Sequence, residues 1–431
     1  DRPKSAKVVI MVFPGRKARP RQGDARPPRF RRRPLPVDSA EPLRAVGTSL
    51  GALHMLTRHG HSDRGEMGGL RAYVKRMHRV WLTYGLRMAL RMTFGSSDFR
   101  HFPARMAGRR CPMTKADERM RANFHHMSQM LDRLEAMGWL THVRNDGPHK
   151  EGPQWAALKL ADRHPLVRGA DWVLYFDIDE FVDIHVGGRT VGDLLAALPD
   201  ATAIALTWRF FGNAGVVEYE DRPVTETFTK AAPGVLHWPW RAALFKTLYR
   251  NDGSYGRLGV HRPRNADGTR LTDQRWYDGS GRRLPAIFHR ERIFSDLGRD
   301  NFRLVQLNHY ALGSMEGFVV KCDRGSVFPG VTGLNMDYWV ERNFCDVVDS
   351  SVLALDSRAE RQALLADAVL GPLHAASVAW RKARFLALMG EESWRSLFGR
   401  LLMTPPTRAI SAEEARLVWR HAIRQIPPGD E

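Results

Sequence analysis

The sequence predicts an α/β protein, and three observations carry that prediction. From Ser128 onward, segments with helical spacing alternate with short apolar runs of strand length. One such run, Trp172–Phe176, is apolar or aromatic at every position, as expected for a strand buried on both faces. Beyond Asp356 only helical spacing remains. We therefore expect a sheet layered by helices, followed by a helical C-terminal region.

Local signals place the individual elements. Gly138 is a good stop for a helix over Ser128–Met137, and Thr190 can cap the helix that follows it. Ser411 and Glu414 form a capping-box start for the last helix. The expected strands cover residues 7–13, 139–143, 172–176 and 203–208, and the expected helices cover residues 128–137, 153–162, 190–199, 358–370, 375–389 and 411–426.

The N-terminal part has a different texture. Residues 14–36 are rich in Arg and Pro and show neither helical nor strand periodicity, which predicts loop or disorder. Residues 71–92 read as a basic amphipathic helix, either packed against the main domain or contacting an anionic membrane surface. We therefore divide the chain into a basic, poorly ordered N-terminal region (1–127), an α/β domain (128–353) and a helical region (354–431).

Composition limits the class of protein and its partners. The 431 residues are 43% hydrophobic, with 12 Trp and 20 Phe, which is typical of a globular protein. No apolar run approaches the roughly 18–20 residues that a membrane span needs. The net charge of +19 favours anionic partners, namely nucleic acid, acidic lipid or phosphorylated substrates.

Cysteine usage bears on the compartment. Cys111, Cys322 and Cys345 are far apart and form neither a metal-binding spacing nor a disulfide framework. We therefore expect a cytoplasmic protein, and the basic segment adds peripheral contact with an anionic inner membrane.

The most informative residues follow the apolar run. Asp177 and Asp179 alternate at its end, with Glu180 beside them. Side chains alternate along a strand, so the two aspartates are expected on one side and Ile178 on the other. Two converging carboxylates repel each other unless a cation lies between them, which predicts a site for a divalent ion. The alternative is a strand that ends in solvated acids.

Further motifs follow this acidic run in order. They are Trp208-Arg-Phe-Phe-Gly-Asn-Ala-Gly215, Gly259-Val-His261, Asn308-His-Tyr310 and Lys321-Cys-Asp-Arg-Gly325. Together with the acidic run, they resemble the bacterial glycosyltransferase family 2-like proteins related to glycosyltransferase family 92. The resemblance extends from about Ser128 to about Leu353.

This resemblance implies a GT-A fold with a mixed, mostly parallel sheet, and a hexosyltransferase-type activity that uses a nucleotide-sugar donor. It implies that Asp177 and Asp179 hold Mn²⁺ (or Mg²⁺) against the donor diphosphate, a role that suits hard oxygen ligands. His309 is the candidate for a further metal ligand, and His261 is the alternative. Lys246, Arg262, Lys321 and Arg324 are candidates to bind phosphate oxygens.

The acceptor is expected to be a carbohydrate or glycolipid of surface polysaccharide synthesis. Trp208, Phe211 and Gly212 are the candidates for its platform, with core packing as the alternative. An inverting transferase needs a carboxylate base. The candidates for that base are Glu180, Glu218, Asp221 and Glu316.

The chain departs from the family pattern before Ser128. Residues 13–17 do not match the turn expected after the first strand, and Asn123–Met127 replaces an expected Asp-Gly element. This implies an atypical nucleotide-binding half that could impair activity. The competing hypotheses are a phosphatase or phosphotransferase that uses the D-x-D acids, and a basic nucleic-acid-binding protein. No specific nucleic-acid module is recognisable in the sequence.

Overall fold

The computed structural model describes residues 9–13, 121–145, 153–324 and 334–423. The expected loop at 14–36 and the expected basic helix at 71–92 therefore lie outside the described residues. The chain forms two compact units, and the first contains every described element up to Ala409. The described part of the second unit is limited to residues 410–423.

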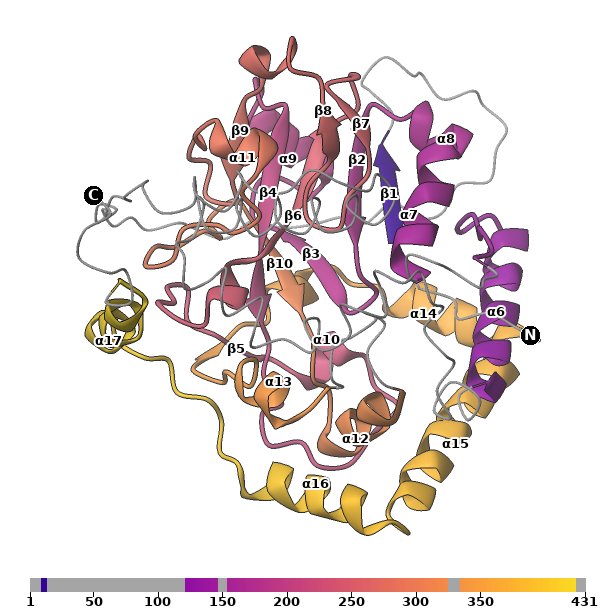
Figure 1. Ribbon diagram of the computed structural model, residues 1–431. Coiled ribbons are helices and arrows are strands. Elements are labelled where there is room, and N and C mark those ends of the chain that lie inside the picture. Colours follow the sequence, from indigo (N-terminus) through magenta and orange to yellow (C-terminus); the bar gives the residue numbers. More distant parts are fainter. Residues whose placement is uncertain (1–8, 14–120, 146–152, 325–333, 424–431) are drawn as a thin grey trace, which may run out of the picture. The chain divides into compact units, whose positions relative to one another are not determined.

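A seven-stranded mixed sheet is the centre of the first unit (Figure 1). The strands follow the order β1-β2-β6-β4-β10-β3, and β9 pairs with β4 beside this path. Their bounds are β1 Val9–Phe13, β2 Trp172–Phe176, β3 Glu180–Ile184, β4 Ala203–Phe210, β6 Phe245–Arg250, β9 Trp276–Asp278 and β10 Val305–His309. Two small antiparallel pairs lie outside this sheet: β5 Lys230–Ala231 with β11 Val347–Val348, and β7 Tyr255–Arg257 with β8 Arg264–Ala266.

The mixed α/β class is confirmed, but the expectation of a mostly parallel sheet is wrong for the described strands. Four of the six pairings in the large sheet are antiparallel, and the two parallel ones join β4 to β9 and to β10. The reason lies in the connection over residues 211–244. This connection leaves β4 and enters β6 at the same end of the sheet, as the pairing of Thr207 with Phe245 shows. β6 therefore runs opposite to both β2 and β4.

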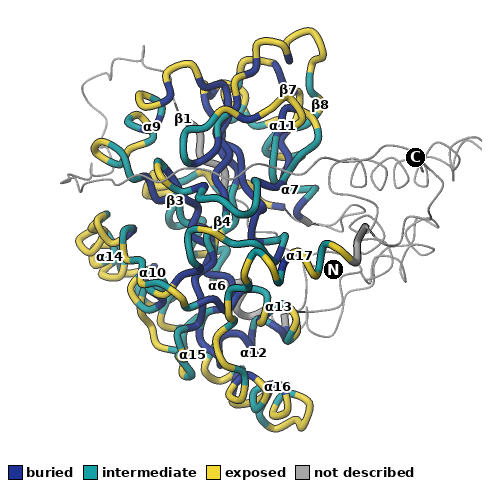
Figure 2. The backbone as a smooth tube through the Cα atoms, turned by 90° about the vertical axis from the view of Figure 1, so that its left-hand side faces the viewer, coloured by how far each residue is buried: buried dark blue, intermediate teal, exposed yellow. Residues whose placement is uncertain are grey.

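Strand β4 explains how the two faces of the sheet are covered. Its residues alternate between two buried clusters, with Ala203 and Ala205 in one and Ile204 and Leu206 in the other. The first cluster includes side chains of helix α7 and of α11, and the second includes Leu194 and Leu198 at α9. In Figure 2 the tube is dark blue along much of these central strands. The helices named here and their short neighbours are α7 Pro153–Arg163, α8 Pro165–Arg168, α9 Val191–Ala197, α10 Val224–Thr227 and α11 Ile287–Arg290, with 3₁₀ turns at Trp240–Ala243, Leu271–Asp273 and Ser351–Ala354.

A helical group follows the sheet in the sequence and has its own core. Phe318 and Trp339 are fully buried in that core, together with Leu388 and Leu401. Helix α15 packs against α6 as well as α12, so the group also contacts the first long described helix. The bounds are α6 Arg121–Ala136, α12 Met315–Arg324, α13 Met336–Val340, α14 Arg358–Leu365, α15 Leu370–Leu388 and α16 Glu392–Met403.

Hydropathy along the described helices identifies no single helix that could cross a membrane. Helices α14 and α15 reach the necessary length and composition only together, and they meet at a bend of 91°.

Most expected elements of the first unit are confirmed, one is wrong, and one helix was missed. Thr190 caps α9 through a reciprocal bond with Asp193. The expected strand over 139–143 is wrong, because Trp139 and Val143 are exposed and His142 is bonded back to Asp132 of α6. Helix α16 was not predicted.

The second unit contributes helix α17, Ala412–Ile423, to the described residues. The expected capping box is confirmed, because Glu414 accepts from the Ser411 amide and donates its own amide to Ser411 Oγ.

Candidate functional site

The acidic residues lie in a tight turn between β2 and β3, which we call the acidic turn (residues 177–180). The expectation that the aspartates extend the strand is wrong, since β2 ends at Phe176. Glu180 closes the turn by accepting the Asp177 amide at 2.9 Å, and its own amide donates to Asp177 O. Ile178 is 58% exposed, whereas each aspartate side chain is about one-third exposed and meets a lysine.

The first lysine is buried on β6. Lys246 Nζ lies 2.7 Å from Asp177 Oδ2 and 3.6 Å from Glu180 Oε1. The Lys246 side chain is fully buried, and its ammonium lies over the Tyr175 ring. The Tyr175 hydroxyl donates to the other oxygen of Asp177. Both carboxylate oxygens of Asp177 are therefore engaged by the protein.

The second lysine lies on α12 and contacts the other aspartate. Lys321 Nζ is 3.1 Å from Asp179 Oδ2 and also donates to Ala311 O. His309 Nε2 lies 3.9 Å from Asp179 Oδ1. Burial raises the pKa of Asp179, but the Lys321 ammonium outweighs it, together with His309 at the acid pH where that ring is protonated, and they hold the pKa of Asp179 well below its usual range. Asp179 is thus an anion at neutral pH.

A buried histidine, His309, and a partly buried one, His261, flank Trp208 of β4. The Trp208 ring lies 4.5 Å from the His309 ring and 5.8 Å from the His261 ring. Burial lowers the pKa of His309 to about 4 and that of His261 to about 3. Both are therefore neutral at pH 7, which is the form that ligates metals. The described contacts bring His309 rather than His261 up to Asp179, since His261 Nδ1 instead meets Phe245 O.

Glu180 is the most deeply buried acid of the turn. Its side chain is fully buried and accepts from the Asp177 amide and from Trp208 Nε1. Burial raises its pKa to about 8, although the Lys246 ammonium opposes that shift. Through its bonds to the Asp177 amide and to Trp208 Nε1, Glu180 links the acidic turn to β4. We refer to the acidic turn with Lys246, His309 and Lys321 as the turn cluster.

Arg342 is a cation near the turn cluster that the sequence reasoning missed. It is 7% exposed, and its guanidinium carbon lies 3.7 Å from the Tyr338 ring centroid. Burial lowers the pKa of Arg342, and its charge helps to lower the pKa of His309. The sequence signal that could have indicated it is the spacing of four positions between Tyr338 and Arg342, which places both side chains on the same side of a helical turn.

A small, partly open hollow lies beside the last residues of β4, and we call it the β4 cleft. Trp208 lines the cleft, so one expected acceptor residue is found there. Phe211 is not among the lining residues: it is buried and its ring lies 4.6 Å from that of Tyr310. Gly212 is needed for close packing, because a Cβ there would lie 2.2 Å from Phe344 O. The lining residues are Thr207, Trp208, Arg209, Phe210, Ala232, Pro233, Gly234, Leu236, Ala242, Ala243, Asp296, Leu297, Arg299, Asn301 and Phe302.

The remaining base candidates lie elsewhere in the structure. Glu218 is exposed. Asp221 pairs with His374 at 2.9 Å, and Glu316 accepts the amide of Tyr219.

No described contact brings the two other expected phosphate ligands to the acids. Arg262 donates to Pro263 O and His289 O. Arg324 ends α12, and its side chain lies outside the described part of the chain.

The residues fit a metal site in part. Within the described ranges, no group of three or more His, Cys, Asp or Glu side chains could hold a metal ion. The pair of Asp179 and His309 does offer a carboxylate and a neutral imidazole that face each other. His309 Nδ1 is buried without a hydrogen-bond partner among the described residues. Such a pair is a partial shell that substrate phosphates and water could complete.

In comparisons with protein-family models, curated proteins and solved structures, nothing matches this chain.

Proposed function

We propose that this chain is a GT-A-like glycosyltransferase that moves a sugar from a nucleotide-diphosphate donor to a carbohydrate or glycolipid acceptor. The observation that carries the proposal is the convergence of two distant motifs on Asp179. Lys321 Nζ at 3.1 Å and His309 Nε2 at 3.9 Å come from motifs more than a hundred residues along the chain. Their order in the sequence is the one that suggested the family.

The donor would bind at the turn cluster. Asp179 and His309 would hold Mn²⁺ or Mg²⁺, and that ion would neutralise the diphosphate as it leaves. Lys321 and Arg342 are the two nearby cations whose donors could meet phosphate oxygens. Asp177 acts differently in this proposal, because Lys246 and Tyr175 already engage its oxygens. It positions the turn.

The acceptor would bind in the β4 cleft. Trp208 forms part of the cleft wall and also donates its indole N–H to Glu180. It therefore joins the two subsites, and a sugar packed on Trp208 would lie next to the turn cluster. Glu180 orients Trp208 and the turn in this scheme.

The location proposed for the enzyme is the cytoplasm, with peripheral contact to an anionic inner membrane in support of surface polysaccharide synthesis. What supports it is the net charge and the cysteine usage. The basic segment that would make the contact lies outside the described residues. Release of the full chain into the soluble fraction at low salt would contradict the membrane contact.

The direct test is a panel of nucleotide-diphosphate sugars, measured for binding and for slow hydrolysis with and without Mn²⁺. The wild-type chain is expected to bind one of them in a Mn²⁺-dependent manner, and Asp179→Ala is expected to lose that dependence. Asp200→Ala is the matched control, because Asp200 is half exposed and contacts Tyr277 and Arg275 rather than the turn cluster. Full Mn²⁺-dependent binding by Asp179→Ala would overturn the proposal.

A further inference from the structure

The two aspartates of the turn cluster are already balanced by cations of the chain. Asp177 meets the Lys246 ammonium at 2.7 Å, and Asp179 meets the Lys321 ammonium at 3.1 Å. Neighbouring carboxylates repel each other unless positive charge lies beside them. Here two lysines supply the charge that the sequence assigned to a divalent ion.

A third cation completes the balance. Burial lowers the pKa of Arg342, while Tyr338 and nearby acids, Asp179 among them, oppose that shift. Glu341 lies 3.6 Å from Arg342 but is itself paired with Arg241 at 2.9 Å. Even with all its acids counted as ionised, the turn cluster together with Arg342 holds three acids and three cations: Asp177, Asp179 and Glu180 against Lys246, Lys321 and Arg342. A free divalent ion would therefore add two positive charges to a set that is already balanced.

The protein also offers few ligands to such an ion. Lys246 and Tyr175 engage both carboxylate oxygens of Asp177. The pair that remains is Asp179 Oδ1 and His309 Nε2, which face each other at 3.9 Å. The His309 side chain is 8% exposed, and its Nδ1 has no hydrogen-bond partner among the described residues. Two protein ligands leave most of an octahedral shell to other oxygens.

A diphosphate removes both obstacles. Its negative charge offsets the charge of the ion, and its oxygens fill positions that the protein leaves open. Lys321 and Arg342 then face an anion as well as a cation, so their charges favour the pair although they oppose the ion alone. Protein sites with one or two carboxylates hold Mg²⁺ in this way, together with substrate phosphates.

We infer that the turn cluster takes up its divalent ion together with a diphosphate, and that Lys321, by neutralising Asp179, keeps the free ion from binding tightly. Each of the two ligands strengthens the binding of the other by the same factor. The statement that the diphosphate belongs to a nucleotide sugar rests on the proposed function. The joint binding does not.

Equilibrium dialysis of the full chain tests the inference, with inorganic pyrophosphate as a diphosphate probe that carries no base. Manganese and phosphorus are measured on both sides of the membrane for Mn²⁺ alone, pyrophosphate alone and the two together. The wild-type chain is expected to bind each ligand about tenfold or more tightly in the presence of the other. Equally tight binding of Mn²⁺ with and without pyrophosphate would overturn the inference, and so would the absence of manganese binding in both conditions.

A charge-removing variant tests the role of Lys321. Lys321→Met is expected to bind Mn²⁺ alone about tenfold more tightly than the wild-type chain, because Asp179 loses its counter-ion and the ion loses a repelling charge. Lys382→Met is the matched control, because Lys382 is exposed on α15 and its removal changes the net charge equally. Unchanged or weaker Mn²⁺ binding by Lys321→Met would contradict the role of Lys321. An equal gain in Lys382→Met would show a general charge effect of the +19 chain and would contradict it too. Urea unfolding shows whether each variant folds, and the wild-type comparison decides the inference if one does not.

The same samples separate this inference from the proposed function, because the panel of nucleotide-diphosphate sugars is titrated beside each dialysis. Mn²⁺-dependent donor binding by a chain that binds Mn²⁺ equally well alone would overturn the joint uptake and leave the transferase intact. Joint binding of Mn²⁺ and pyrophosphate without any binding of a nucleotide sugar would do the reverse.

Discussion

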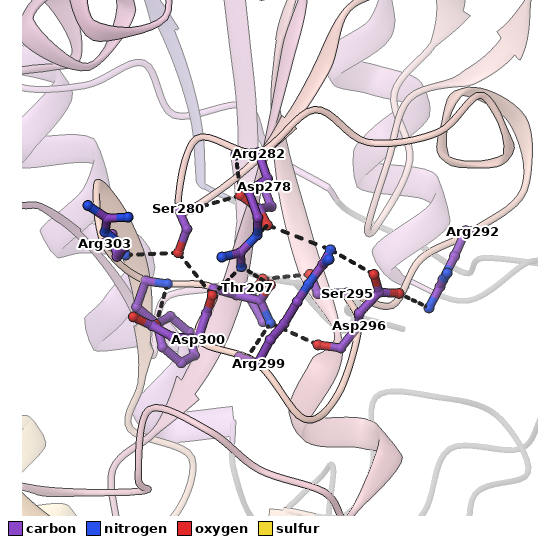
Figure 3. Close-up of polar contacts among 12 residues, drawn as sticks. Thr207, Asp278, Ser280, Arg282, Arg292, Ser295, Asp296, Arg299, Asp300 and Arg303 are labelled. Carbon is purple, nitrogen blue, oxygen red and sulfur yellow. Dashed lines mark hydrogen bonds and ion pairs between the residues drawn. The ribbon is translucent and has the colours of Figure 1, made fainter. Parts of the chain in front are cut away.

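Two of the clusters that acids and cations form among the described residues are built in opposite ways. What we call the arginine network begins at the last residue of β9 and continues into the segment between β9 and β10 (Figure 3). Its members are Asp278, Arg282, Arg292, Asp296 and Arg299, and all five lie within 22 consecutive positions. The turn cluster draws on four separate stretches of the chain, at residues 177–180, 246, 309 and 321.

The two clusters differ in how completely the protein buries their acids and satisfies them with donors. Asp278 is fully buried, accepts two backbone amides and meets two arginines. Asp177 and Asp179 keep about a third of their side-chain surface exposed, and each meets a single lysine ammonium. A satisfied local network fixes loops, whereas an open long-range cluster keeps oxygen atoms available to a ligand. Substitutions should therefore separate stability from binding.

The largest effect is expected in the arginine network. Asp278→Ala should lower the free energy of unfolding by about 3–5 kcal/mol, because it leaves buried donors and guanidinium groups without their acceptor. Urea unfolding monitored by tryptophan fluorescence would measure it. Asp296→Ala is the control and should cost about 1 kcal/mol, since Asp296 is 31% exposed. Equal costs for the two variants would remove the distinction between closed and open acids.

The next effect concerns the one fully buried lysine of the turn cluster. Lys246→Met should cost about 3 kcal/mol, because Asp177 and Glu180 lose the ammonium that they share. The loss should grow from pH 6 to pH 9, since Lys246 lowers the pKa of Glu180 and its removal makes ionisation of that acid more costly. Unfolding curves at several pH values would show the trend. Lys321→Met, at a partly exposed site, should lose about 1 kcal/mol.

A pH-dependent effect is expected for Glu180. Its pKa is raised to about 8 in the folded chain, so the folded state holds a proton that the unfolded chain releases near its usual pKa. Its contribution to stability is therefore complete at low pH and falls as pH rises through this interval, by up to about 1.4 kcal/mol per pH unit. Glu180→Gln should flatten this dependence in unfolding measurements between pH 5 and 8. An unchanged slope would mean that Glu180 is ionised throughout.

The sequence predicted the elements whose cause is local. The β2 strand follows from an unbroken apolar run, and the start of α9 follows from Thr190 and Asp193, three residues apart. The strand expected around Trp139 failed because an apolar pattern does not reveal whether a partner covers it. Here Trp139 and Val143 are exposed.

The candidate site was predictable as a set of residues but not as a set of contacts. Motif order indicated that Asp179, His309 and Lys321 would belong together, and their described contacts agree with that. The engagement of Asp177 by Lys246 depends on β6 lying between β2 and β4 in antiparallel pairing. A sheet expected to be mostly parallel could not suggest it. Arg342 was missed because its role depends on the packing of α13.

The substitution that we expect to change stability least is also the one that we expect to weaken donor binding most. Asp179→Asn should change the free energy of unfolding by about 1 kcal/mol or less, because Asp179 is a third exposed and Lys321 keeps its bond to Ala311 O. The same variant should weaken Mn²⁺-dependent donor binding by about tenfold or more, since an amide is a poorer ligand for a hard cation than a carboxylate. Unfolding and donor titration on one preparation would measure both. A large loss of stability without any loss of donor binding would contradict this prediction. Asp179 would then have a structural role like that of Asp278, and the turn cluster would be structural like the arginine network.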